Sequence, residues 1–113
     1  MPETVLWSDL LDEQGPFFRA LYTTDRAQTG FMTIPPGQEA GPAETHNASD
    51  QVFYIVRGKA EFKVWNKGEA EEPLHRTAKG GHVVVVPAGV PHWVKSTGQE
   101  PLRFLTVYAP AEY

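Results

Sequence analysis

The stretch Gly81-His82-Val83-Val84-Val85-Val86-Pro87-Ala88-Gly89-Val90-Pro91-His92 decides the fold. Its four consecutive valines form a short apolar run of β-branched side chains, which is typical of a buried strand. Gly81 and Pro87 end this run on either side, and residues 88–91 have the composition of a tight turn. The stretch therefore predicts a strand, a turn and a second strand, with an imidazole at the start of the second strand.

The rest of the chain follows the same pattern of short strands between turn residues. Proline and glycine each occur 10 times and are spread along the chain as turn punctuation. A turn of helix is expected at residues 8–13, a polar loop at 38–43, a turn at 66–68 and an exposed acidic connection at 69–73. Strands are expected at residues 4–7, 17–23, 30–34, 51–57, 59–65, 74–78, 83–86, 92–96 and 102–108. Nine or ten short strands with almost no helix predict an all-β sandwich or barrel.

The composition restricts the class of protein. A chain of 113 residues with 41% hydrophobic residues suits one domain, spanning residues 1–113. Because there is no cysteine, any metal must take nitrogen and oxygen ligands. The net charge of −4 argues against a nucleic-acid partner. No apolar run reaches membrane-spanning length and residues 1–4 lack signal-peptide features, so we expect a soluble, cytoplasmic protein that does not bind membranes.

A second group of polar residues precedes the strand at 51–57. Glu44 and His46 are two residues apart, so in an extended chain both side chains project from one face. Gln51 opens the strand and Gly58 ends it. Phe53 and Ile55 share the face of Gln51 by alternation, so we expect them to line the interior beneath a site.

These two segments resemble the motifs of the cupin family. The second motif is matched by Gly81, Pro87, Gly89 and His92, with Ser96 in place of the final Asn. The first motif is matched in its spacing from His46 to Gln51 and on to Gly58. Glu44 stands where the first His is expected and Gln51 where the Glu is expected, while Gly37 lies nearer than Gly41 to the place of the leading glycine. The core motifs span residues 36–58 and 81–96.

The resemblance implies a double-stranded β-helix, or jelly-roll barrel, whose inner face presents four ligands to one divalent metal. The carry-over assigns these ligands to Glu44, His46, Gln51 and His92. Two imidazoles, one carboxylate and one amide oxygen suit iron, manganese, nickel, cobalt or zinc. The exchanges at 44 and 51 leave the ligands with one negative charge. If Glu44 points away, Asp50 is an alternative ligand, although alternation places it on the face opposite Gln51.

The resemblance further implies an enzyme that acts on a small polar metabolite such as a sugar or a carboxylic acid. The spacing of His46 and Gln51 is similar to that of uronate-processing cupins, which favours isomerase or lyase chemistry over dioxygenase chemistry. Glu44 is then also the candidate catalytic base. Two alternatives stay open: a non-catalytic module that binds or senses a small ligand, and a structural β-domain with a degenerate site. The resemblance also implies a homodimer.

The remaining residues considered for the site divide into two groups. His75 and His82 are expected to be structural or exposed, because neither belongs to the motifs. Other side chains could reach a pocket, and the sequence does not decide among them: Arg19, Tyr22, Met32 and Arg57.

Overall fold

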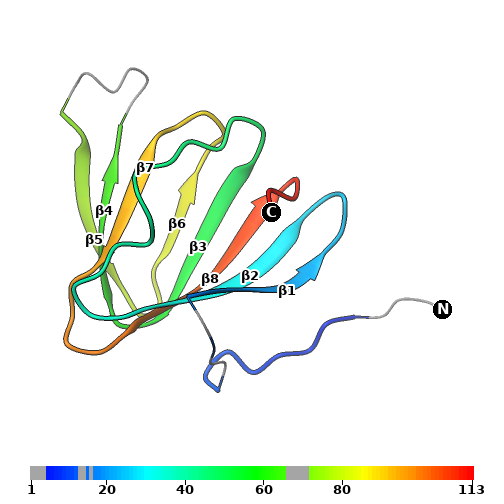
Figure 1. The fold of residues 1–113 in the computed structure, drawn as a ribbon, viewed down its shortest axis with the longest axis horizontal. Helices are drawn as coiled ribbons and strands as arrows, with labels where there is room; N and C mark the ends of the chain where they lie inside the picture. The colour runs from blue at the N-terminus through cyan, green and yellow to red at the C-terminus, as the bar shows by residue number, and fades with distance from the viewer. Residues whose placement is uncertain (1–4, 13–14, 16, 66–71) are drawn as a thin grey trace.

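The fold consists of two antiparallel sheets that face each other (Figure 1). The computed structural model describes residues 5–12, 15, 17–65 and 72–113. Within them lie the strands β1 (Phe18–Thr23), β2 (Gln28–Ile34), β3 (Asp50–Arg57), β4 (Lys59–Val64), β5 (Leu74–Lys79), β6 (Val83–Val86), β7 (His92–Ser96) and β8 (Leu102–Ala109). The larger sheet has the order β1-β2-β8-β3-β6 and the smaller sheet the order β5-β4-β7. This confirms the expected all-β fold.

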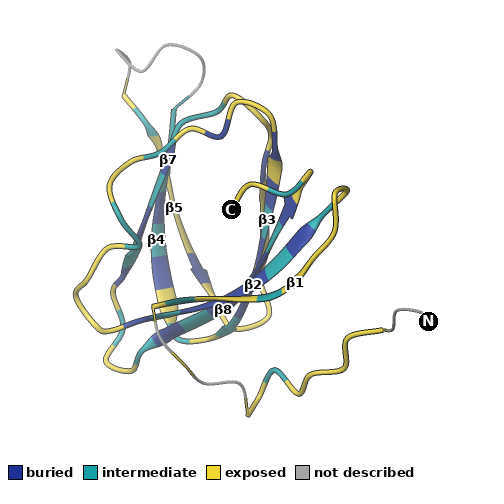
Figure 2. Ribbon diagram, turned by 45° about the vertical axis from the view of Figure 1, so that its right-hand side comes forward, coloured by how far each residue is buried: buried dark blue, intermediate teal, exposed yellow. Residues whose placement is uncertain are grey.

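The strands β3, β7 and β8 alternate between a buried inner face and a more exposed outer face (Figure 2). In β8 the residues at 102, 104, 106 and 108 are buried, while those between them are partly exposed. In β3 the buried residues Gln51, Phe53 and Ile55 share one face, as the period-two pattern predicted. Because a shift of one residue would move every buried side chain of such a strand to the outer face, burial fixes its register.

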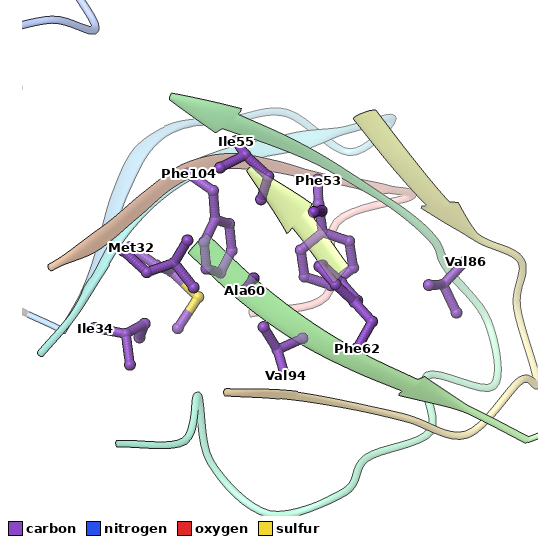
Figure 3. Packing of buried hydrophobic residues seen from close by; sticks show 11 residues of the cluster. Met32, Ile34, Phe53, Ile55, Ala60, Phe62, Val86, Val94 and Phe104 are labelled. Atoms are coloured by element: carbon purple, nitrogen blue, oxygen red, sulfur yellow. The ribbon is translucent and has the colours of Figure 1, made fainter. Parts of the chain in front are cut away.

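An aromatic cluster joins the two sheets (Figure 3). Phe53 of β3 lies edge-on to Phe62 of β4, with the ring centroids 5.1 Å apart, and 5.3 Å from Phe104 of β8. Met32 and Val94 pack into the same cluster. Because edge-to-face rings are favourable beyond their buried area, this cluster holds the two layers in register and forms the floor of the space between them.

The sharp turn between β3 and β4 requires a glycine. Gly58 has a φ of 90°, which side chains disfavour, and a Cβ there would lie 2.8 Å from the Cα of Leu102. Gly58 therefore lets β3 pass directly into β4, from the larger sheet to the smaller one.

The sequence predictions fail at the N-terminus and in the number of strands. The described residues contain eight strands rather than nine or ten, and residues 5–7 form no strand. Trp7 is 87% exposed, so this segment has no sheet edge on which to bury its apolar side chains. Residues 10–12 form a turn closed by the Asp12 amide and the Asp9 carbonyl rather than a turn of helix. The predicted turn at 66–68 lies outside the described residues, as does most of the connection at 69–73.

The bounds of the other strand predictions are confirmed to within about two residues. The strand at 83–86 is not buried as its four valines predicted: β6 is the edge strand of the larger sheet, and Val83 and Val85 are 61% and 58% exposed. The loop at 38–43 contains only isolated bridge pairing. No helix among the described residues is both long and apolar enough to cross a membrane.

Candidate metal centre

Backbone pairing brings the two motif segments together at one end of the barrel. Glu44 and His92 form an isolated β-bridge, in which each amide donates to the other's carbonyl at 2.9 Å. The Gly89 amide in the turn before β7 donates to the His46 carbonyl, also at 2.9 Å. Residues almost fifty positions apart in sequence are therefore fixed beside one another by main-chain hydrogen bonds.

The imidazoles of His46 and His92 face each other across this junction. Their ring centroids are 5.2 Å apart, and each residue is only 5% exposed. The Nδ1 atom of His92 lies 3.0 Å from the Val90 carbonyl oxygen. Since a carbonyl only accepts, Nδ1 carries the proton and Nε2 presents its lone pair. Burial lowers the pKa of His92, which keeps this ring neutral and available as a ligand.

His46 has a carboxylate on each side of its ring. Its Nδ1 lies 3.4 Å from Glu112 Oε2, and its Nε2 lies 3.5 Å from Glu44 Oε1. The buried Nε2 atom makes no hydrogen bond. With the proton on Nδ1, toward Glu112, Nε2 is a buried acceptor, and a carboxylate behind one ring nitrogen is the arrangement that orients histidine ligands in metal sites.

Gln51 contributes a second buried acceptor. Its amide nitrogen donates to Thr106 Oγ1 at 2.9 Å and to the Tyr108 hydroxyl at 3.1 Å. These two hydrogen bonds orient the side chain, which is 3% exposed, and its Oε1 atom has no partner. Burial raises the pKa of Tyr108, so its hydroxyl stays protonated. A buried amide oxygen without a donor is costly unless something else binds it.

Glu44 lies at the edge of this group. Its side chain is 40% exposed and its Oε1 accepts a hydrogen bond from the Tyr113 hydroxyl at 3.3 Å. Within the described residues, no three His, Asp or Glu side chains lie close enough together to hold a metal ion by themselves. A metal ion at this place would therefore also need the unpaired Gln51 amide oxygen.

A cavity of about 240 Å³ opens beside these residues. Glu44, Gln51 and His92 line it, and the structure thus brings together the four residues that the motifs predicted. Asp50 is exposed and its Oδ1 accepts a hydrogen bond from the Ala88 amide, so it faces away as alternation indicated.

The residues outside the motifs also have clear positions. His75 and His82 are exposed, as predicted. Of the four side chains that the sequence left undecided, Met32 lines the cavity, and Arg19, Tyr22 and Arg57 are not among its lining residues.

Sequence reasoning missed four residues of the site. Thr106 and Tyr108 share the inner face of β8, and alternation along that strand is the signal that could have found them. Glu112 and Tyr113 follow β8 and carry no pattern. They are placed by tertiary contacts, because Gln28 pairs with both backbone polar groups of Tyr113 and Ser49 Oγ lies 2.9 Å from Glu112 Oε1.

Comparison with known proteins identifies the family. Residues 30–108 match the model of the Cupin domain family. The chain is 31% identical over 103 residues to the uncharacterized protein YrkC of Bacillus subtilis, covering 89% of this chain and 53% of that protein, so it spans about half the length of this relative. This chain belongs to the cupin family, and its two sheets form the double-stranded β-helix of that family.

Two solved structures are also similar. The crystal structure of BH2720 from Bacillus halodurans superposes with a TM-score of 0.82 at 28% identity, covering 87% of this chain and 73% of that chain. Oxalate decarboxylase of Bacillus subtilis, studied for its Mn(II) centres, superposes with a TM-score of 0.70 at 25% identity, covering 79% of this chain and 23% of that chain.

Proposed function

We propose that this cupin binds one divalent metal ion at the mouth of its barrel and acts there on a small carboxylic acid. One observation carries the proposal: two buried acceptors without a donor, His46 Nε2 and Gln51 Oε1, lie in one cluster with the neutral imidazole of His92. Buried polar atoms are rarely left unpaired. A cation would satisfy both of them.

The residues present fit such an ion. His46, His92, Gln51 and Glu44 offer two nitrogen and two oxygen donors with one negative charge, a set suited to manganese, iron, cobalt, nickel or zinc. The similarity to a decarboxylase with Mn(II) centres supports a metal in this family. Such a metal, when bound, would polarise a carbonyl or carboxylate oxygen of the substrate.

Glu44 is the proposed catalytic base. Its carboxylate lines the cavity, is 40% exposed and is held by the Tyr113 hydroxyl. A carboxylate in this place can accept a proton from a carbon next to a carbonyl while the C–H electron pair moves into the enolate. Return of the proton to another position gives isomerase-type chemistry, and loss of a neighbouring group gives lyase-type chemistry.

Isomerase or lyase chemistry is proposed ahead of dioxygenase chemistry because a positioned base is present and neither of these reactions needs an oxidant. The alternative, a module that binds or senses a small ligand without turnover, would share the metal and the cavity. The homodimer and the cytoplasmic location stay predictions.

The metal is tested by dialysing the protein against Co(II) and measuring metal content and binding by calorimetry. We expect one equivalent in the unaltered protein and none in the double variant His46→Ala/His92→Ala. The matched control is His75→Ala/His82→Ala, which removes two exposed imidazoles and should keep the full equivalent. Failure of Co(II), Mn(II), Fe(II), Ni(II) and Zn(II) alike to bind would overturn the proposal.

A further inference from the structure

We propose that the substrate has an apolar tail as well as an oxygen-bearing head, which excludes sugars and dicarboxylic acids. This inference rests on the proposed function and specifies its substrate. The observation behind it is the lining of the cavity, where the candidate ligands Gln51, His92 and Glu44 adjoin a wall of aromatic and aliphatic side chains.

Three strands place polar and apolar side chains next to each other on the cavity face. In β3 Gln51 is followed two residues on by Phe53, and in β7 His92 is followed by Val94. In β8 the order runs from Tyr108 through Thr106 to Phe104. Residues two apart on a strand project from the same face about 6.6 Å apart. Each strand thus presents a polar group and, two or four residues along the same face, an apolar group.

The apolar wall of the cavity is continuous across neighbouring strands. Met32 of β2 pairs in register with Phe104 of β8, and Phe18 packs against the same cluster from β1. Phe53, Phe104, Val94 and Met32 are each no more than 8% exposed and all line the cavity. Figure 3 shows these side chains pointing toward one another between the sheets. Such a wall favours a hydrocarbon group and offers no hydrogen bond.

The charges that line the cavity also favour a substrate with an apolar tail. No lysine or arginine is among the described residues that line it, and the charged group that does line it is the Glu44 carboxylate. A second carboxylate on the substrate would lie against aromatic rings without a cation or donor, and burying an unpaired charge is costly. A sugar would bring several hydroxyls to the same wall, each losing its hydrogen bonds to water.

The size of the cavity limits the tail. A volume of about 240 Å³ corresponds to roughly eight water molecules at their share of the liquid volume. The cavity therefore suits a small 2-oxo or 2-hydroxy acid with a short branched or aromatic tail, its oxygens toward the proposed metal ion and its tail toward Phe104 and Met32.

The test uses two acids with the same 2-oxo acid head and nearly the same size. 4-Methyl-2-oxopentanoate has a branched hydrocarbon tail and 2-oxoglutarate has a carboxylate tail. Both are titrated by calorimetry into the Co(II)-loaded protein, whose metal content is measured first. We expect the branched acid to bind at least tenfold more tightly than 2-oxoglutarate.

A substitution at the mouth tests whether the lining sets this preference. Phe17 lines the cavity and is 42% exposed, so Phe17→Lys supplies a cation without opening the core. This variant should narrow the affinity ratio at least threefold by improving 2-oxoglutarate binding. The control Leu11→Lys, at a residue 64% exposed and outside the cavity, should leave the ratio unchanged.

The outcomes separate this inference from the proposed function. A protein that takes up Co(II) but binds the two acids equally, prefers 2-oxoglutarate or binds neither would overturn the apolar-tail inference alone. A protein that takes up no Co(II) would overturn the proposed function and this inference with it.

Discussion

Two histidine–carboxylate pairs in this protein differ in the surroundings of the histidine nitrogen that does not contact the carboxylate. His75 Nε2 lies 2.6 Å from Glu61 Oε2, with the His75 side chain 52% exposed on β5. His46 Nδ1 lies 3.4 Å from Glu112 Oε2, but the His46 side chain is 6% exposed and its other nitrogen is buried and makes no hydrogen bond.

The shorter contact is therefore the one between His75 and Glu61, on the exposed side of the sheet, where it contributes little. An exposed ion pair contributes little, because water and salt screen it. In the buried pair Glu112 lies beside one nitrogen of a ring whose other nitrogen is buried and makes no hydrogen bond. The burial of the second nitrogen, rather than the length of the contact, distinguishes a candidate ligand from a surface histidine.

The largest expected effect comes from the second carboxylate beside His46. Glu44→Gln should slow exchange of the C3 protons of 4-methyl-2-oxopentanoate in D₂O by at least about 100-fold, because general base catalysis contributes that much or more. Proton NMR of the loaded protein measures the rate. The variant should still hold one equivalent of Co(II) at saturation.

Glu61→Gln is the matched control for this exchange, because it changes a carboxylate beside the exposed His75. Its exchange rate should equal that of the unaltered protein. Equal exchange in Glu44→Gln and the unaltered protein would remove Glu44 as the base.

A smaller effect is expected from Glu112→Gln. The amide can still contact His46 Nδ1 but no longer fixes its tautomer by charge, and loss of such a partner typically lowers metal affinity 10–100-fold. Competition titrations with Co(II) measure the affinity, and the Co(II) absorption spectrum reports the ligand geometry. Glu61→Gln should change neither. If the two variants had the same affinity, the contrast between the two pairs would have no functional meaning.

The smallest expected effect is on stability. Burial lowers the pKa of His92 below its ordinary value of 6.5. Between the lowered pKa and 6.5 the unfolded chain binds more protons than the folded chain, so the free energy of unfolding of the metal-free protein decreases as the pH falls through this range. One such group contributes a slope of at most about 1.4 kcal/mol per pH unit.

Urea unfolding at a series of pH values measures this slope. His92→Asn should lose the contribution and show a shallower decline in acid, whereas His75→Asn, at an exposed position, should keep it. An identical decline in His92→Asn and the unaltered protein would contradict the burial of a neutral ring at this position.

Prediction from sequence succeeded where a local pattern had one physical meaning. The alternation around Phe53 predicted the strand β3 and its buried face. Gly81 and Pro87 predicted both ends of the strand at residues 83–86. Prediction failed at residues 5–7, whose composition suits a strand but which have no sheet edge to pair with. Strand propensity expresses a fit to neighbours, so it does not by itself create a strand.

From the sequence alone came the all-β class of fold and the absence of thiolate ligands, because alternation and composition can be read over a few residues. The four residues of the candidate centre came from the resemblance of two segments to the cupin motifs. The positions of Glu112 and Tyr113 beside His46 come from the tertiary structure alone. So do the hydrogen bonds from the Gln51 amide nitrogen to Thr106 and Tyr108, which leave the amide oxygen unpaired, and the largely apolar lining of the cavity. These features depend on contacts between residues 55 to 85 positions apart. Such contacts form only when the whole barrel closes, so alternation along β8 could indicate the inner face of Thr106 and Tyr108 but not their partner Gln51.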